Sequence, residues 1–307
     1  MPCPADWPLP DRELSLQACV AAVERQLEQA SLYFGHGTDN AHDEAAWLVM
    51  MASGINVGGF EGDWQQTLVS SQLREVRKLA DERISSRRPL AYLVNRAWFA
   101  GHEFYIDERA IVPRSHIAEW LPERFEPWLD ATAVNRVLDL CTGSGCIAVA
   151  LALAFPGSLV HAADLSVAAL EVASINVARH KVEDQVRLVC SDLFEELKGS
   201  CYDLIVCNPP YVSDSLIADL PAEYLHEPAQ AFAAGCDGLD LVRRLLSKAR
   251  RFLTDNGTLV MEVGSAAAAV ESTWPEVPFT WLASAHGEPV VLVLTAGELD
   301  HYAGQFR

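Results

Sequence analysis

The stretch Asn208-Pro209-Pro210-Tyr211 combines residue types that can hold one planar NH₂ group. Successive prolines stiffen the backbone and fix the direction of its carbonyl groups. The Asn208 side-chain oxygen and the Pro209 carbonyl can then accept the two N–H hydrogens, while Tyr211 offers a ring face for stacking. We therefore predict that Asn208, Pro209 and Tyr211 are catalytic residues, and that all four residues bind the substrate.

Such a site suits a reaction in which an amide or amino nitrogen is the nucleophile. An amide nitrogen is a poor nucleophile because its lone pair is delocalised into the carbonyl. Holding both N–H bonds aims the nitrogen at an electrophile, and the two acceptors stabilise the positive charge that grows on it. In-line attack on the methyl group of a sulfonium compound would need no metal, general-base histidine or covalent intermediate. The motif thus predicts methyl transfer without a metal site.

A glycine-rich turn runs from Asp139 to Gly145, as Asp-Leu-Cys-Thr-Gly-Ser-Gly. Its glycines permit a tight turn and let the backbone approach a ligand before the next helix. About twenty residues further on, Asp164 ends a second apolar run, where a carboxylate can accept hydrogen bonds from ribose hydroxyls. The full dinucleotide fingerprint is missing because Ala148 replaces its third glycine. The spacing indicates a nucleoside cofactor, although a glycine turn can also serve packing alone.

A third apolar run ends at Asp192 and Leu193. The Asp192 carboxylate could reach an adenine amino group while Leu193 covers the ring, although either residue could instead belong to a helix cap. The residues that we predict to bind the cofactor are Asp139, Cys141, Thr142, Gly143, Ser144, Gly145, Asp164, Asp192, Leu193 and Asn208.

From residue 134 onward, short apolar runs alternate with helix-length segments, which predicts a mostly parallel sheet with helices on both faces. Ligands of such sheets bind at the carboxyl ends of the strands. The last two runs leave no room for a helix between them, so we expect an antiparallel pair there. The predicted strands are 136–140, 158–163, 185–190, 202–207, 258–263, 280–283 and 290–295.

The first 90 residues have a different pattern. Apolar residues recur at helical spacing over 14–32, 43–51 and 65–84, with Thr38 to Asn40 available as capping groups. Residues 91–112 interleave aromatic and polar side chains around Gly101, which predicts a β-hairpin. Residues 117–128 resemble a helix interrupted by Pro122. We expect a helical domain over 1–90, a β-hairpin linker over 91–116 and an α/β domain over 117–307.

The composition limits the partners and the compartment. The 307 residues carry 42 acidic and 23 basic side chains, so the net charge is −19, which repels a nucleic-acid backbone. The charge suits a basic protein partner, or solubility alone, and the short basic cluster Arg83–Arg88 is predicted to be a solvated helix end. No apolar run of about 18 residues and no export signal is present, so we expect a cytoplasmic protein.

The eight cysteines are scattered without paired CxxC spacing, which gives no indication of a zinc site. Four of them lie in or beside apolar runs, where buried, reduced thiols are expected. These four are Cys141, Cys146, Cys190 and Cys207.

The glycine turn, Asp164 and Asn-Pro-Pro-Tyr, in this order, resemble the protein N(5)-glutamine methyltransferases, over nearly the whole chain. The resemblance implies a Rossmann-like class I methyltransferase sheet with an antiparallel last strand, S-adenosylmethionine as cofactor, and a glutamine side chain of another protein as acceptor. It also implies that the helical domain recognises the substrate. Glu223 to Pro228 is similar to a family segment that would form a lid over the site.

Two segments are similar to the PrmB branch of that family, which modifies a glutamine of large-subunit ribosomal protein L three. They are Tyr33 to Asn40, containing Gly-His-Gly-Thr-Asp-Asn, and Trp98 to Arg114. The branch that modifies peptide release factors has Pro-Arg-Pro and an acidic residue where this chain has Ser115 and His116 after Pro-Arg. The chain departs from the PrmB pattern at 285–289, where Ala-His-Gly-Glu-Pro replaces Gly-Gly-Asp-Gly, so the turn there should differ.

Three alternatives remain open from the sequence. Release factors could be the substrate in place of L three. An enzyme acting on amino groups of nucleic-acid bases would use the same motifs, although the acidic charge argues against it. A non-catalytic assembly factor could keep the fold without the reaction. If L three is the substrate, its basic free or assembling form should be preferred over the RNA-rich finished ribosome.

Overall fold

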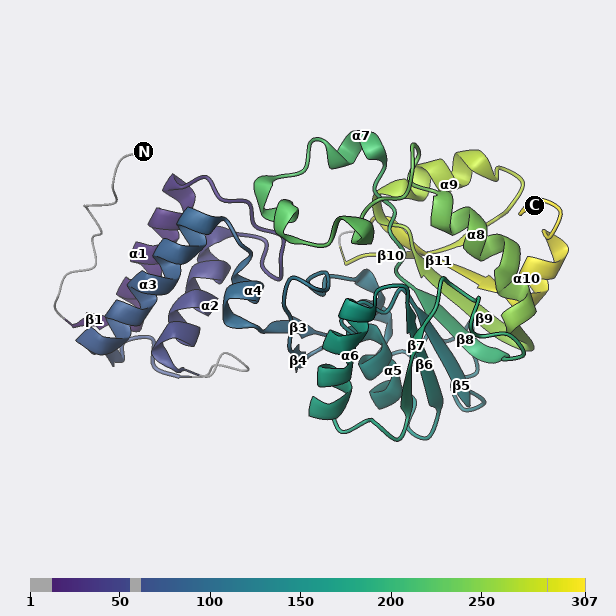
Figure 1. The fold of residues 1–307 in the computed structure, drawn as a ribbon, viewed down its shortest axis with the longest axis horizontal. Coiled ribbons are helices and arrows are strands. Elements are labelled where there is room, and N and C mark those ends of the chain that lie inside the picture. Colours follow the sequence, from purple (N-terminus) through teal and green to yellow (C-terminus); the bar gives the residue numbers. More distant parts are fainter. Residues whose placement is uncertain (1–12, 56–61, 286, 307) are drawn as a thin grey trace. The chain divides into compact units, whose positions relative to one another are not determined.

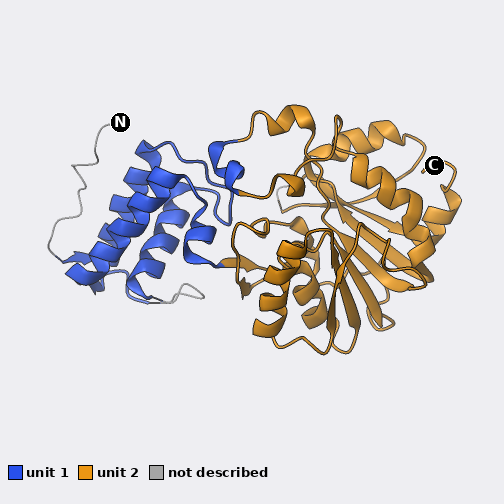
Figure 2. Cartoon of the chain, viewed as in Figure 1, with its two compact units in different colours: residues 1–96, 221–226 blue, residues 97–220, 227–307 orange. Residues whose placement is uncertain are grey.

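The computed structural model describes residues 13–55, 62–285 and 287–306. The chain divides into two compact units, coloured separately in Figure 2. Unit 1 comprises residues 1–96 and 221–226, and unit 2 comprises 97–220 and 227–307. A segment that follows the predicted acceptor motif in sequence therefore belongs to the helical unit.

The helices α1, α2 and α3 of unit 1 lie where the helical spacing predicted them (Figure 1). Asn40 caps α2, since its side chain accepts a hydrogen bond from the Asp43 backbone N–H, and Gly54 ends the helix in the left-handed conformation. The third helix begins at Ser70, later than expected, because Thr67 and Leu68 pair with Leu14 and Ser15 as short strands. The elements are β1 (Leu14–Ser15), α1 (Leu16–Gln29), α2 (Ala41–Ser53), β2 (Thr67–Leu68), α3 (Ser70–Ser86) and α4 (Leu90–Val94).

The basic cluster at the end of α3 is not simply a solvated helix end, and this prediction was wrong. Arg83 is completely buried, and its Nε donates to Glu44 Oε1 at 2.7 Å. Arg87, about one-third exposed, lies with its NH2 2.7 Å from Glu223 Oε1. A buried guanidinium is tolerable only when it is paired, and that pairing cannot be read from local spacing.

Unit 2 has the predicted α/β architecture. Within the described residues its sheet has seven strands in the order β10-β11-β9-β8-β5-β6-β7. The pairs among β7, β6, β5, β8 and β9 are parallel, whereas β11 is antiparallel to both of its neighbours. The strands are β5 (Arg136–Leu140), β6 (Leu159–Asp164), β7 (Val186–Cys190), β8 (Tyr202–Cys207), β9 (Leu253–Glu262), β10 (Thr280–Ala283) and β11 (Pro289–Thr295).

Helices cover both faces of this sheet, which confirms the predicted class of fold (Figure 1). Apolar side chains of α5 (Cys146–Ala154) and α6 (Val167–Arg179) pack in one buried cluster, and those of α8 (Asp240–Ala249), α9 (Ala267–Thr273) and α10 (Ala296–His301) pack in another. The first cluster also takes in Phe99, Phe104 and Ile117 from the segment before the sheet. Burial on both faces explains why the central strands are continuous apolar runs.

The segment between the units differs in detail from the prediction. The hairpin spans only β3 (Ala97–Phe99) and β4 (His102–Phe104), because residues 90–94 form the short helix α4. The predicted helix over 117–128 is limited to a 3₁₀ helix, His116–Trp120. Pro122 lacks an N–H, and Arg124 and Phe125 have φ values of 50° and 60°, which end any helical path.

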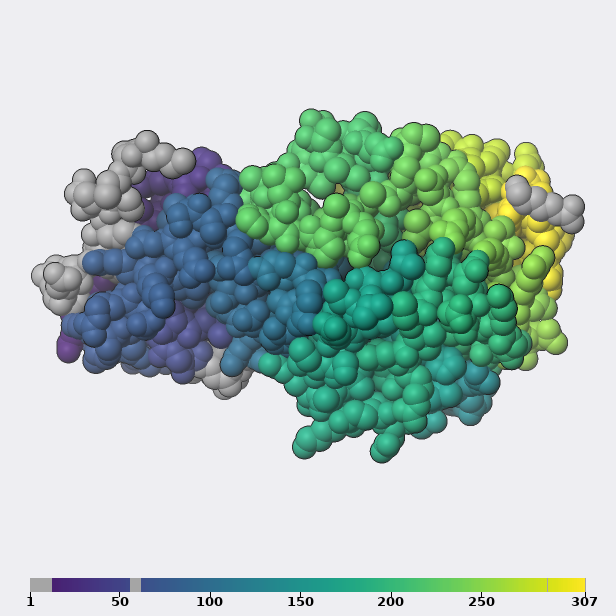
Figure 3. Space-filling view, viewed as in Figure 1, coloured from purple at the N-terminus to yellow at the C-terminus, as the bar shows by residue number. Residues whose placement is uncertain are grey.

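After β8 the chain leaves unit 2 for a short stretch, residues 221–226, that belongs to unit 1. The chain first forms the short exposed helix α7 (Asp214–Ile217), light green at the surface in Figure 3, and then the 3₁₀ helix Ala222–His226 within unit 1. Glu223 of that 3₁₀ helix is fully buried, accepts a hydrogen bond from the Tyr33 N–H and forms an ion pair with Arg87. Unit 2 resumes at Glu227.

The cysteines follow the prediction only in part. Cys146 and Cys207 are buried, but Cys141 is half-buried and Cys190 is exposed, because β7 is an edge strand with one side uncovered. No helix in the described part of the chain is long and apolar enough to cross a membrane. The altered turn at 285–289 pairs the Ser284 N–H with the Glu288 carbonyl, and its residue His286 lies outside the described residues.

Candidate active site

The glycine turn lies at the carboxyl end of β5, where the fold places ligands. Cys141, Gly143 and Gly145 all have positive φ values, of 58°, 54° and 77°. A Cβ at Gly145 would stand 2.9 Å from the Ala173 Cβ, so only glycine lets α5 start this close to α6. The Gly145 N–H donates back to the Thr142 carbonyl at 2.9 Å, which closes the turn.

Asp139 lies beneath this turn and is completely buried. Its Oδ2 accepts a hydrogen bond from the Thr142 hydroxyl, whereas its Oδ1 has no hydrogen-bond partner among the described residues. Burial raises the pKa of Asp139 to about 7. A buried acceptor without a donor costs free energy, so a ligand that supplies a donor here would be bound favourably.

Asp164 holds the turn to the neighbouring strand. Its Oδ2 accepts from the Gly143 N–H and its Oδ1 from the Ser166 N–H, each at 2.8 Å. Burial raises its pKa as well. The structure thus brings Asp139, the turn and Asp164 into one connected group.

Sequence reasoning missed Asn176, a buried residue in α6. Its amide group donates to the Ser144 carbonyl at 2.8 Å and to the Tyr105 carbonyl at 3.0 Å, and it accepts from the Tyr105 N–H at 2.7 Å. One side chain therefore joins the glycine turn, residues 139–145 and hereafter the cofactor turn, to the segment after the hairpin. Nothing local distinguishes this asparagine from any other polar residue in a helix.

Asp192 and Leu193 follow β7, beside Asp164, since the Ser191 N–H donates to the Asp164 carbonyl at 2.9 Å. Both Asp192 carboxylate oxygens lie 2.8 Å from Arg244 NH2 of α8, and this ion pair is about half exposed. Leu193 has a φ of 51° and is buried in the core. In this structure Asp192 thus has an arginine partner, which the sequence gave no reason to expect.

The acceptor motif follows β8, the strand next to β5, and the register pairs Leu140 with Cys207. Asn208 therefore lies at the same edge of the sheet as the cofactor turn. No hydrogen bond within the described residues occupies the Asn208 side chain, which leaves both its oxygen and its NH₂ group available for a ligand. Pro209 is buried, whereas Pro210 and Tyr211 are half-buried.

Glycines and a carboxylate surround Tyr211. A Cβ at Gly264 would meet its ring at 2.6 Å, and a Cβ at Gly238 would meet its backbone carbonyl oxygen at 2.5 Å. Its hydroxyl donates to Glu262 Oε1 at 3.3 Å. The ring therefore has a defined place at the carboxyl ends of β8 and β9.

Glu262 is the second residue that sequence reasoning missed. It is the last residue of β9 and is only 1% exposed. Its Oε2 accepts from the Ser115 hydroxyl at 2.6 Å and from the His116 N–H at 2.8 Å, and burial raises its pKa. A signal existed: a glutamate at the end of an apolar strand lies where ligands bind in such sheets.

A further buried carboxylate, that of Glu227, contacts the segment just before Ser115. Glu227 forms a two-point ion pair with Arg114, at 2.9 and 2.7 Å, and Glu227 Oε1 also accepts from the Val112 N–H at 2.9 Å. The Pro-Arg-Ser stretch is thus held twice, by Glu227 at Arg114 and by Glu262 at Ser115.

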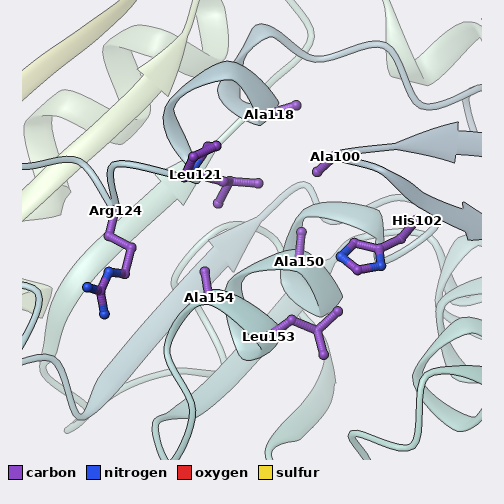
Figure 4. Close-up of a pocket in the computed structure, with 9 residues that line it drawn as sticks. Ala100, His102, Ala118, Leu121, Arg124, Ala150, Leu153 and Ala154 are labelled. Atoms are coloured by element: carbon purple, nitrogen blue, oxygen red, sulfur yellow. The ribbon is translucent and has the colours of Figure 1, made fainter.

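One surface pocket lies elsewhere. Figure 4 shows it between the second half of α5, with Ala150, Leu153 and Ala154, and the hairpin residues Ala100 and His102. The predicted site residues do not line it, and the cofactor turn is at the opposite end of α5. We do not assign the reaction to this pocket. In the described residues, no group of three His, Cys, Asp or Glu side chains is arranged to hold a metal ion.

Comparison with known proteins decides the family. Residues 125–235 match the methyltransferase small domain family. The chain is 44% identical to the ribosomal protein uL3 glutamine methyltransferase of Neisseria meningitidis over 91% of both chains. It is 45% identical to that of Bordetella pertussis, over 91% of this chain and 94% of the other, and 43% identical to that of Burkholderia pseudomallei, over 92% and 94%.

The chain belongs to the ribosomal protein uL3 glutamine methyltransferase family. The family resemblance and the enzyme class predicted from the sequence are thereby confirmed, and S-adenosylmethionine is the methyl donor. The glycine turn, the buried Asp139 and the Asn208 amide lie at one edge of the sheet of this uL3 glutamine methyltransferase. The residues present therefore fit the cofactor, notably through the donor-free Oδ1 of Asp139.

Proposed function

We propose that this enzyme methylates the side-chain amide nitrogen of a glutamine in ribosomal protein uL3, the L three protein of the large subunit. The observation that supports this most directly is the free Asn208 amide beside the cofactor turn, in a chain whose relatives are named for that reaction. Of those relatives, the ones from Neisseria and Bordetella are 44% and 45% identical.

The proposed roles follow the chemistry of each group. The turn from Cys141 to Gly145, with Asp139 below it and Asp164 beside it, would bind S-adenosylmethionine, which supplies an electrophilic methyl group. Asp164 would accept hydrogen bonds from the ribose. Asp192 and Leu193 would contact the adenine, provided that Asp192 shares its carboxylate with Arg244 or releases it.

On the acceptor side, Asn208 and Pro209 would each accept one N–H of the glutamine amide, and Tyr211 would stack on its plane. Both N–H bonds are then fixed, so the nitrogen lone pair points toward the methyl group and away from solvent. Pro210 would keep the two acceptors at a constant separation.

The helical domain over 1–90 would recognise the substrate, with 91–116 as linker and 117–307 as the catalytic domain. We further propose a cytoplasmic location and free or assembling uL3 as the form that is modified, since an acidic protein of net charge −19 attracts a basic protein and is repelled by ribosomal RNA. Faster modification of intact large subunits than of free uL3 would contradict this preference.

The deciding experiment incubates the enzyme with methyl-labelled S-adenosylmethionine and, in separate reactions, free uL3 and a release factor. We expect label on a uL3 glutamine, located by mass spectrometry, and a loss of at least about 100-fold in the Asn208→Ala variant, because misorientation of the nucleophile costs that much. Cofactor affinity, measured by calorimetry, should fall less than turnover does, because Asn208 is only one of the several residues predicted to bind the cofactor. Label on the release factor alone would overturn the substrate, and cofactor binding without any transfer would favour a non-catalytic role.

A further inference from the structure

Glu262 lies at the carboxyl end of β9, next to the strand that leads into the acceptor motif. It ends β9 one residue after Met261, which the sheet register pairs with Cys207, and Asn208 follows Cys207 in the same way. The glutamate and the acceptor asparagine are therefore equivalent positions on adjacent strands. Only 1% of Glu262 is exposed, so the carboxylate is removed from solvent at the edge where the reaction is proposed.

Three donors converge on this carboxylate. The Ser115 hydroxyl and the His116 N–H both donate to Oε2, at 2.6 and 2.8 Å, and the Tyr211 hydroxyl donates to Oε1 at 3.3 Å. Hydrogen bonds to an ionised acceptor are stronger than neutral ones, and a backbone N–H can only donate. The set of donors thus favours the ionised carboxylate against the opposing effect of burial.

The contact with Tyr211 restricts the ring at its polar end, while Gly264 restricts it along one edge, where a Cβ would come within 2.6 Å. Glu262 and Gly264 are separated by one residue at the end of the same strand. A single short segment therefore sets both the direction of the phenol and the space in which its ring lies.

We propose that Glu262 is a positioning residue for methyl transfer, which holds the Tyr211 ring and the Ser115–His116 backbone in place around the acceptor amide. This inference rests on the proposed function. Glu262 does not touch the substrate in this scheme: it acts through Tyr211, whose ring face must stay parallel to the plane of the amide. Its loss should lower the turnover number and leave binding of S-adenosylmethionine nearly unchanged.

The test is a double-mutant cycle on turnover with uL3 as substrate, using Tyr211→Phe, Glu262→Ala and the combination. We expect Tyr211→Phe to lower kcat by roughly 10-fold and Glu262→Ala by roughly 100-fold. Because both act on one ring, the double variant should stay within about threefold of Glu262→Ala alone. If the fold-losses in kcat of the two single variants multiply fully in the double variant, the inference is overturned.

Two further variants separate positioning from stability. Glu262→Gln keeps the shape and an oxygen for Ser115 and His116, so its kcat should lie between those of the wild type and Glu262→Ala. Ser115→Ala removes one donor and leaves the Tyr211 contact, so it should lower kcat less than Tyr211→Phe does. If Glu262→Ala does not fold, the cycle is measured with Glu262→Gln, and independence of that variant from Tyr211→Phe would equally contradict the proposal.

The wild-type reaction distinguishes the two hypotheses. Absence of transfer to uL3 by the wild-type enzyme would reject the proposed function. Normal wild-type transfer, with Glu262 variants that raise the KM for S-adenosylmethionine at an unchanged kcat, would reject only the positioning role.

Discussion

The proposed cofactor side and the proposed acceptor side of the site are held together in different ways. The cofactor turn is held by partners no more than 32 positions away in the chain. Thr142 bonds Asp139, Gly143 bonds Asp164 on the next strand, and Ser144 bonds Asn176 of the following helix. The acceptor motif is surrounded by groups from distant parts of the chain, with Glu262 bonding both Tyr211 and Ser115.

The difference shows what each side requires. A cofactor with fixed chemistry can be bound by a short turn whose conformation depends on glycine. A poor nucleophile has to be oriented, and orientation requires groups that converge from several elements. Buried carboxylates suit this task because each can accept several hydrogen bonds from separate segments.

The largest expected effect concerns the acceptor side and is a loss of stability. Arg114→Met would leave the fully buried Glu227 side chain without its two-point partner. Removing one member of a buried ion pair costs about 3–5 kcal/mol. Urea unfolding of unit 2 should show this loss, and the double variant Arg114→Met/Glu227→Met should recover much of it. A single variant as stable as the wild type would mean that the Pro-Arg-Ser stretch is not held by this pair.

The second prediction concerns the cofactor side. Gly145→Ala combines an unfavourable φ of 77° with a Cβ 2.9 Å from Ala173, so it should cost about 1–3 kcal/mol and weaken cofactor binding. Gly157→Ala is the matched control, because its φ is 92° but nothing lies within 4 Å of the new Cβ. Calorimetry should show weaker cofactor binding, and thermal unfolding a larger loss of stability, for Gly145→Ala than for Gly157→Ala. Equal losses of stability in the two variants would show that packing against α6 is unimportant.

The most gradual effect is a pH dependence on the cofactor side, because it accumulates over several pH units. Burial raises the pKa of Asp139 from 3.8 to about 7, so the folded state holds a proton that the unfolded chain has released over that interval. The stability from this group is complete below about pH 4 and is lost as the pH rises through about 7, by at most about 1.4 kcal/mol per unit. Without cofactor, the wild type should therefore lose stability relative to Asp139→Asn over that range. Parallel stability curves for the two proteins would contradict the assignment.

The sequence by itself determined the sheet and its antiparallel end, because these depend on local patterns. Apolar runs of strand length between helix-length segments specify parallel strands buried on both faces. Asn208 to Tyr211 and the glycine turn carry their predicted chemistry in consecutive residues, so the sequence alone predicted an amide or amino nitrogen as acceptor and a nucleoside cofactor.

Tertiary structure alone decided which buried charges are paired. Arg83 was expected in solvent and is instead buried against Glu44, and Glu262 contacts Ser115 across 147 positions of the chain. Asn176 likewise joins Tyr105 to Ser144 without any local signal. A buried polar group must find a partner, but the identity of that partner depends on which segments the fold brings together, and no periodicity along the chain records it.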